Sequence, residues 1–195
     1  MEKIFSILFL SNMMEEKGVW TLVEACRILK EHSFKFECHY VGKWSDITEE
    51  IFNKRIAENE LKGKVFAHGA KYGEKKSIFW KNADVFVFPT YYHNECFPLV
   101  LLEAMQHGKA CIASNEGGIP AIIEEGKTGY MVKKKDAKLL AEKIEFLLKN
   151  PSLCQQMGEN GRKKFLEEFT IERFENNMKD ILEKELCQNS DSAIN

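Results

Sequence analysis

Short apolar runs alternate with longer amphipathic segments along most of the chain. Near-continuous apolar runs lie at Ile4 to Leu10 and at Val85 to Phe88, whereas apolar residues recur every three or four positions between Val19 and Leu29. Unbroken apolar runs are typical of strands covered on both faces, and a spacing of three to four is typical of helices. The pattern therefore predicts strands and helices in turn.

Glycine, proline and polar clusters set the ends of the predicted elements. The predicted strands cover 4–10, 34–41, 64–68, 85–88, 110–113 and 126–132. The predicted helices cover 18–31, 46–59, 73–80, 97–108, 136–148, 152–169 and 171–186, with a helical turn at 119–124. The alternation, repeated six times, predicts an α/β fold with a Rossmann-like parallel sheet of about six strands and helices on both faces.

The size and composition of the chain predict one domain. With 195 residues, 44% of them hydrophobic, the chain can bury one good core. We expect a single domain over 1–187, with a terminal helix at 171–187 and a disordered tail at 188–195. Its six cysteines form no CxxC pair, and the N-terminus lacks a small-residue cleavage site, which favours reduced thiols and a cytoplasmic location.

The charge of the chain argues against nucleic acid as a partner. A net charge of −2 and a pI near 6.3 leave no global basic field. Short basic runs at 133–135 and 162–164 could touch anionic lipid, so peripheral association with the inner face of a membrane stays open beside the commoner interpretation of a solvated face. His68, His93 and His107 form no metal-ligand pattern, and no Asp-x-Asp is present, so no metal is expected.

The stretch ADVFVFPTYYHNECFPLVLLEAMQHG carries the clearest chemistry. It predicts a strand, a loop with Glu95 and a helix with Glu103. Backbone N–H groups at a helix start suit phosphate, and carboxylates suit sugar hydroxyls. The loops at 11–18, 67–73, 89–97 and 114–118 all follow predicted strands, so they should share one edge of the sheet. These residues predict a nucleotide-sugar site at that edge.

Several motifs resemble, in the same order, the C-terminal half of retaining group 1 glycosyltransferases. The motifs are EKG, ADVFVFP, ECFPLVLLE followed by AM and G, and NEGGIPAIIEEGKTGYMV, and the match runs from about Ile4 to Phe174. The resemblance implies a GT-B enzyme, in which two Rossmann-like domains face each other across a cleft. The family's N-terminal domain, which supplies the acceptor site, has no counterpart in these 195 residues.

The resemblance therefore implies the donor-binding half of an enzyme that transfers a hexose to a glycan or lipid-linked acceptor in polysaccharide or glycoconjugate biosynthesis. It also implies that no cofactor and no metal are needed, because the nucleoside diphosphate sugar is itself the substrate. Two alternatives remain: a non-catalytic nucleotide-sugar-binding module that acts with a partner chain, and a degenerate homologue kept for interactions.

The resemblance assigns two residues to catalysis. Lys17 of the EKG motif meets the donor diphosphate and neutralises charge on the leaving group, and Glu95 meets the hydroxyls of the transferred sugar. Glu103 accepts hydrogen bonds from the ribose hydroxyls. Each residue also has an alternative interpretation without a functional role. Lys17 could be a solvated loop lysine, Glu95 an ordinary loop acid, and Glu103 a glutamate on the solvent-exposed face of a helix.

The remaining assignments concern the rim of the same site. Pro98 is expected as the first helical residue, so the amides of Phe97 and Leu99 hold phosphate. Asn12 stands where the family usually has an arginine, and offers a hydrogen bond without a charge. Gly118 is expected to let the backbone approach the ligand closely, with a tight turn as the alternative. The loop 67–71, which includes His68, is expected to border the base.

Overall fold

The structure is a computed structural model that describes residues 4–192, with side chains described as far as Lys184. It contains one parallel sheet in the strand order β3-β2-β1-β4-β5-β6. The strands are β1 (Phe5–Leu10), β2 (Phe36–Val41), β3 (Val65–Ala67), β4 (Val85–Phe88), β5 (Ala110–Ser114) and β6 (Gly129–Val132). The predicted Rossmann-like fold is confirmed, and this order places a switch point between β1 and β4.

The helices fall close to their predicted positions. They are η1 (Glu15–Lys17), α1 (Val19–Glu31), α2 (Glu49–Glu58), α3 (Gly73–Asn82), α4 (Leu99–Gln106), α5 (Ile119–Ile122), α6 (Ala137–Lys149), α7 (Pro151–Glu168) and α8 (Ile171–Ser192). The short helix η1 lies inside a segment that was predicted as loop only. Gly18 precedes α1 instead of starting it, because its backbone is left-handed, with φ of 83°.

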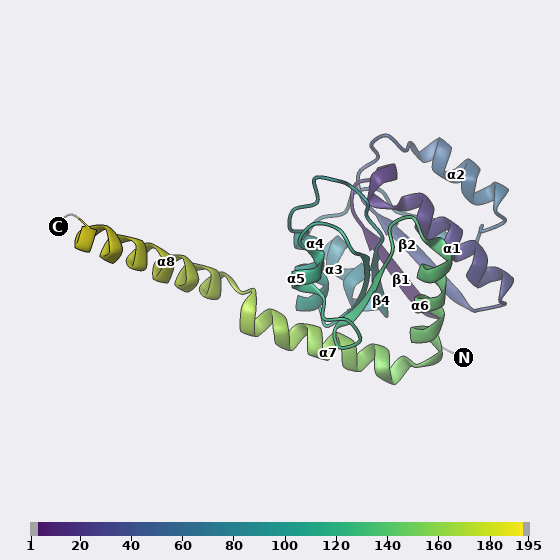
Figure 1. Cartoon of the computed structure of the whole chain (residues 1–195). Coiled ribbons are helices and arrows are strands. Elements are labelled where there is room, and N and C mark those ends of the chain that lie inside the picture. Colours follow the sequence, from purple (N-terminus) through teal and green to yellow (C-terminus); the bar gives the residue numbers. More distant parts are fainter. Residues whose placement is uncertain (1–3, 193–195) are drawn as a thin grey trace.

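Helices cover both faces of the sheet, as predicted (Figure 1). The Tyr40 hydroxyl of β2 donates to the Val19 carbonyl of α1 (3.2 Å), and its ring meets Phe52 of α2. The neighbouring His39 points to the other face, where its ring lies against Phe79 of α3. In addition, α1 packs on α6 and α4 packs on α7. The core is therefore two apolar layers, one on each side of the sheet.

The predicted common rim of loops is confirmed, because backbone hydrogen bonds join the loops that follow the strands. The N–H of Gly42 donates to Gly69 O (3.1 Å), that of Tyr91 to Glu16 O (2.7 Å) and that of Gly118 to Cys96 O (2.8 Å). These bonds connect the loops after β2 and β3, after β1 and β4, and after β4 and β5. The carboxyl edge of the sheet is therefore a continuous framework of polar backbone.

The last helix, α8, extends away from the body of the domain (Figure 1). It continues through Ser192, so the prediction that a disordered tail begins at 188 is wrong for 188–192, and 193–195 lie outside the described residues. The helix continues because its sequence holds no glycine or proline that would stop it. Its described side chains leave five large apolar residues exposed, namely Ile171, Phe174, Met178, Ile181 and Leu182.

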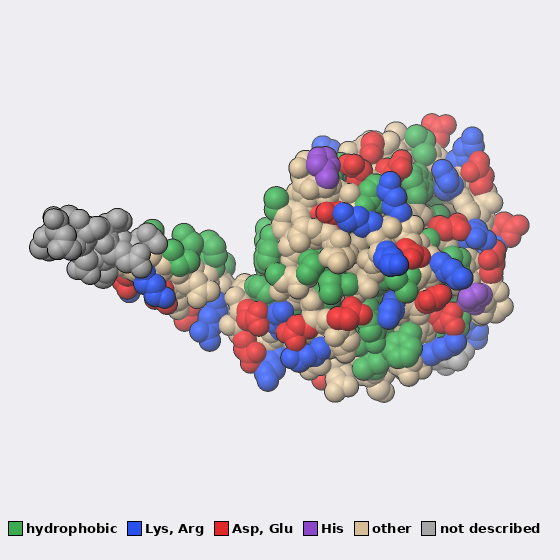
Figure 2. Space-filling view, in the orientation of Figure 1, with side chains coloured by type: hydrophobic (Ala, Val, Ile, Leu, Met, Phe, Trp, Pro, Cys, Tyr) green, Lys and Arg blue, Asp and Glu red, His purple; other side chains and the backbone are tan. Residues whose placement is uncertain are grey.

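The surface carries both signs of charge. Figure 2 shows Lys and Arg interspersed with Asp and Glu over this face of the domain. Lys164, in one of the predicted basic runs, lies within 3.4 Å of Glu124, so part of that positive charge is neutralised locally. Within residues 4–192, no helix is both long and apolar enough to cross a membrane.

Candidate functional site

The two residues predicted to be catalytic form an ion pair at the carboxyl edge. Lys17 ends η1 after β1, Glu95 lies in the loop after β4, and Lys17 Nζ is 2.6 Å from Glu95 Oε2. The two side chains are only 14% and 10% exposed. Gly18 permits this approach, because a Cβ there would lie 2.1 Å from the Pro89 carbonyl oxygen. The site thus holds a largely desolvated positive charge against a carboxylate.

Aromatic and hydroxyl groups surround this pair. Lys17 Nζ lies 4.3 Å from the centre of the Tyr92 ring, a distance at which the ring attracts a cation. The hydroxyl of Thr90 lies 3.2 Å from Glu95 Oε2, and Thr90 is fully buried. Lys17 is therefore fixed between a ring and a carboxylate before any ligand binds.

Glu103 is paired as well. Its two carboxylate oxygens accept from Lys76 Nζ at 3.0 and 2.9 Å, and Lys76 lies in the first turn of α3. The two side chains are 37% and 29% exposed, so solvent reaches this pair more easily than the pair of Lys17 and Glu95. Both acids of the ECFPLVLLE motif thus face a lysine, and Glu103 is not merely a solvated acid.

The start of α4 lies beside these acids. The helix begins at Leu99, and Pro98 precedes it with an extended backbone, so the prediction that Pro98 is the first helical residue is wrong by one position. The first N–H groups of a helix have no acceptor within the helix, which leaves those of Leu99 and Val100 available. The Phe97 ring packs edge-on against Phe169 (6.0 Å between centres), while Leu99 is 69% exposed. Phosphate binding by the Phe97 and Leu99 amides stays a prediction.

The glycines after β5 lie against the loop that carries Glu95, and their approach to a ligand stays a prediction. A Cβ on Gly118 would lie 2.3 Å from Cys96 O, and one on Gly117 would lie 1.5 Å from Glu95 O. The Gly118 N–H is also used, because it donates to Cys96 O. The close approach at Gly118 is therefore to the loop that carries Glu95. The tight-turn interpretation fits, and these glycines position that loop.

His68 follows β3 and pairs with a second histidine. Its Nε2 lies 3.1 Å from Nδ1 of His39, and its ring lies 4.6 Å from that of Phe79. Burial lowers the pKa of both histidines, and the neighbouring charge of Lys71 lowers that of His68 further. Two neutral imidazoles and a phenyl ring, tilted against one another, can offer a weakly polar wall. Contact with the base stays a prediction.

Asn12 lies at the same edge and is exposed. Its backbone carbonyl accepts from the Met14 N–H (2.8 Å), which closes the turn between β1 and η1. The side chain therefore stands in solvent near the base of the loop that carries Lys17.

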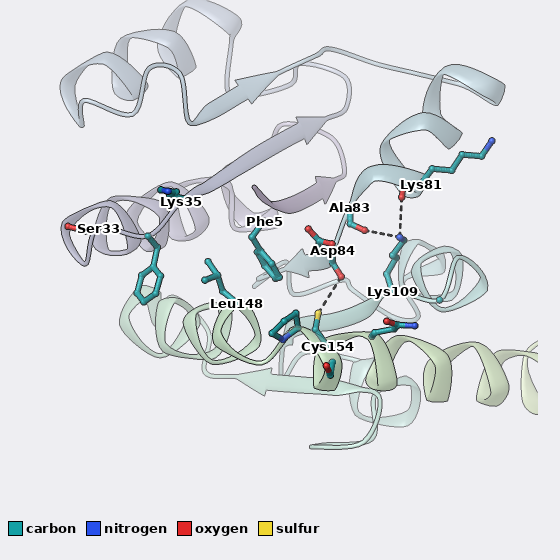
Figure 3. Close-up of a pocket in the computed structure, with 14 residues that line it drawn as sticks. Phe5, Ser33, Lys35, Lys81, Ala83, Asp84, Lys109, Leu148 and Cys154 are labelled. Carbon is teal, nitrogen blue, oxygen red and sulfur yellow. Dashed lines mark hydrogen bonds between the residues drawn. The ribbon is translucent and has the colours of Figure 1, made fainter. Parts of the chain in front are cut away.

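A separate cavity of about 930 Å³ lies at the opposite edge of the sheet, where β1 and β4 begin (Figure 3). Lys109 Nζ donates to the carbonyl oxygens of Ala83 (2.7 Å) and Lys81 (3.5 Å), and the Cys154 thiol donates to that of Asp84 (3.4 Å). The bonds of Lys109 tie the start of β5 to the segment before β4, and the bond of Cys154 ties α7 to the same segment. The cavity is remote from every residue predicted for the donor site.

The described residues include no cluster of side chains that could hold a metal ion. Within 4–192, no three His, Cys, Asp or Glu side chains gather closely enough to hold an ion. The positive charge at the site comes from Lys17 and Lys76. Independence from metals remains a prediction.

Four site residues were missed by the sequence analysis. They are His39, Lys76, Thr90 and Ser114, and they contact His68, Glu103, Glu95 and the Thr90 backbone. Thr90 and Ser114 had a signal, since Thr90 lies in the predicted rim loop 89–97 and Ser114 directly follows the predicted strand 110–113. The others lie far along the chain from their partners, so no local pattern marks them.

Comparisons with known proteins agree with this geometry. A family model for Glycosyl transferases group 1 matches residues 2–164. The capsular polysaccharide biosynthesis glycosyltransferase CapM of Staphylococcus aureus is 29% identical over an alignment of 171 residues, and the match covers 85% of this chain and 42% of CapM. The match supports the resemblance found in the motifs.

Solved structures agree on the fold. The structure of HepE from Anabaena in complex with UDP and glucose superposes with a TM-score of 0.82 at 19% identity, covering 92% of this chain and 48% of HepE. The C-terminal domain of LpcC, a glycosyl transferase group 1 family protein from Francisella tularensis, gives 0.74 at 24% identity, covering 86% of this chain and 87% of that domain. The chain thus spans less than half of CapM and HepE and most of the LpcC domain.

Proposed function

The chain belongs to the glycosyl transferases of group 1, and on that premise we propose that it is the donor-binding half of a retaining hexosyltransferase. The proposed ligand is a nucleoside diphosphate sugar at the carboxyl edge of the sheet. The observation that carries this proposal is the largely buried pair of Lys17 and Glu95 beside the start of α4.

The pair suits a diphosphate sugar because the positive charge of Lys17 can meet the diphosphate while the negative charge of Glu95 meets the sugar. Lys17 can exchange the Glu95 carboxylate for the diphosphate and stabilise the charge that develops as the leaving group departs. Glu95 is then available to accept hydrogen bonds from the sugar hydroxyls. The N–H groups at the start of α4 add donors for the diphosphate.

Glu103 is proposed to accept hydrogen bonds from the ribose hydroxyls of the donor. Its carboxylate is a pure acceptor, and it lies in α4, which begins beside the predicted phosphate site. Lys76 holds it in place through two hydrogen bonds. Among known structures of this fold, HepE is described with UDP and with UDP-glucose, which makes uracil the first base to test here.

In the proposed reaction the bond between the anomeric carbon and the diphosphate oxygen breaks while a bond to an acceptor oxygen forms on the same face. The acceptor hydroxyl gives its proton to the departing diphosphate, so no protein nucleophile and no cofactor or metal is needed. Cys96, exposed in the loop beside Glu95, lines the site without bonding to the sugar.

The acceptor side is proposed to lie in a second domain or partner chain, with a glycan or lipid-linked acceptor in polysaccharide biosynthesis, as the name of CapM suggests for that protein. A cytoplasmic location, with contact to the inner membrane face, would suit such an acceptor. The alternative is a binding module without turnover of its own.

Calorimetric titration of the purified chain with UDP, GDP, UDP-glucose and GDP-mannose tests the proposal. We expect one of the nucleotides to bind, with affinity reduced by about tenfold or more in Lys17→Ala and in Glu103→Ala, because each removes a charge-assisted contact. Lys127→Ala, a lysine paired with Glu124 outside the rim, serves as the matched control and should bind normally. No binding across the panel would overturn the proposal and favour a degenerate homologue. Rapid sugar transfer by this chain alone would instead overturn the assignment as a donor half.

A further inference from the structure

Thr90 occupies a position in the site that the proposed chemistry does not yet use. It is fully buried, and its hydroxyl lies 3.2 Å from Glu95 Oε2, 3.3 Å from Glu16 O and 3.2 Å from the Tyr92 N–H. The hydroxyl of Ser114, also fully buried, donates to the Thr90 carbonyl. Thr90 is thus anchored from β5. Its hydroxyl lies between the loop that carries Lys17 and the Glu95 side chain of its own loop.

The Thr90 hydroxyl has one proton but two acceptors within reach. Its lone pairs accept from the Tyr92 N–H, while its proton can go either to Glu16 O or to Glu95 Oε2. Glu16 O already accepts the Tyr91 N–H at 2.7 Å, a shorter bond. The proton can therefore serve Glu95 without leaving the Glu16 carbonyl unsatisfied.

Glu95 needs such a donor once a ligand is bound. The described side chains that bond its carboxylate are Lys17 and Thr90, and its side chain is only 10% exposed. When Lys17 turns to a diphosphate, the carboxylate loses its charged partner in a poorly solvated place. A largely buried carboxylate with no donor would be costly and free to rotate.

We propose that Thr90 is a positioning residue that holds the Glu95 carboxylate toward the donor sugar after Lys17 has moved to the diphosphate. This inference rests on the proposed function, because it assumes that the sugar meets Glu95. Thr90 itself touches neither the sugar nor the diphosphate. Changing Thr90 should therefore weaken the affinity for the nucleotide sugar more than the affinity for the nucleotide alone.

A purely structural role for Thr90 predicts a different result. The bonds to Tyr92 and Glu16 could simply close the loop after β4, and losing them would weaken UDP and UDP-glucose binding equally. A positioning role weakens UDP-glucose more than UDP. The ratio of the two dissociation constants separates the two roles.

The test compares Thr90→Val, which keeps the shape and removes the hydroxyl, with Thr90→Ser, which keeps the hydroxyl. Thr128→Val is the matched control, since Thr128 is a buried threonine whose hydroxyl accepts the Glu124 N–H near β6. UDP and UDP-glucose are titrated into each variant by calorimetry, with GDP and GDP-mannose as the second pair. Thermal melting checks that each variant is folded, and Thr90→Ala replaces Thr90→Val if the latter is not.

We expect Thr90→Val to reduce the affinity for the nucleotide sugar about tenfold more than the affinity for the nucleotide. Thr90→Ser and Thr128→Val should keep the wild-type ratio. An equal loss for both ligands, or no loss, overturns the positioning role while leaving donor binding intact. If the wild type binds none of the four compounds, the proposed function fails and this inference fails with it.

Discussion

Lys17 Nζ lies 2.6 Å from Glu95 Oε2 although the two residues are 78 positions apart in the chain. The contact exists because β1 and β4 are adjacent in the sheet, so that the loops at their carboxyl ends meet. A cation held in place before the ligand arrives does not have to be reorganised when charge develops. The pair is thus both a stabilising contact and a prepared anion site.

Breaking this pair on one side should destabilise the domain. We expect Lys17→Met and Glu95→Gln each to lower the free energy of unfolding by about 1–3 kcal/mol, because each leaves a poorly solvated charge without its partner. The double variant should lose less than the sum of the two. Urea unfolding of the wild type, the two single variants and the double variant measures these free energies. Strict additivity would show that the two side chains do not interact in solution.

Gly117 should tolerate no side chain. Gly117→Ala would place a Cβ 1.5 Å from Glu95 O at a residue with φ of 49°, so both a clash and backbone strain oppose it. The matched control is Gly126→Ala, where φ is 74° but no atom lies within 4 Å. We expect the control to cost about 1 kcal/mol through strain alone, and Gly117→Ala to cost clearly more. Equal melting temperatures for the two variants would contradict the packing described here.

The layout of the sheet could be predicted from the sequence because the central strands β1 and β4 are nearly continuous apolar runs. All four residues of β4 are buried, and glycine or proline follows β2 and β4 directly. The pairing of Lys17 with Glu95 was not predicted, but their placement on one rim was. The helix α8 was predicted to end at 187 because the residues that follow are polar. It continues to Ser192 because no glycine or proline interrupts it.

The rest of the site depends on contacts between distant segments. Lys76 lies 27 residues from Glu103, and His39 lies 29 residues from His68, so neither partner follows from a local motif. Gly118 shows the opposite case. Its lack of a side chain allows the close approach of Cys96 O, and the predicted approach to a ligand at the same glycine stays a prediction.

The histidine pair should make stability depend on pH. Burial lowers the pKa of His39, with Glu37 opposing the shift, and burial together with His39 and Lys71 lowers that of His68. The unfolded chain therefore takes up protons first as the pH falls below about 6.5, the ordinary value for histidine. The stabilisation from the neutral pair is fully present above that pH and is lost as the pH falls from there through the lower pKa values of the folded state.

Denaturant unfolding between about pH 7.5 and 5.5 measures this dependence. We expect His68→Phe, which keeps a ring against Phe79, to lose less stability on acidification than the wild type. Some dependence will remain, because burial also lowers the pKa of His107. The exposed loop residue His93, changed to asparagine, serves as the control. A His68→Phe profile with the wild-type slope would mean that the pair does not titrate as described.

The helix α8 should be dispensable for the stability of the domain. Ending the chain after Thr170 removes five apolar side chains that are 42–77% exposed and keeps the contact of Phe97 with Phe169. We expect the free energy of unfolding to change by less than about 1 kcal/mol. Ending the chain after Asn150 also removes the buried Cys154 and Met157 and should cost more than about 3 kcal/mol. Similar losses for both truncations would contradict this account.

The position of the donor site is tested most directly by backbone amide NMR of the chain during titration with UDP-glucose, or with the nucleotide sugar that calorimetry selects. The carboxyl edge should respond, with shifts clustered at 12–18, 68–72, 95–103 and 115–118. The amino-edge cavity around Lys35, Asp84, Lys109 and Ser152 should stay unchanged. Saturable shifts confined to that cavity, with a silent carboxyl edge, would contradict the account.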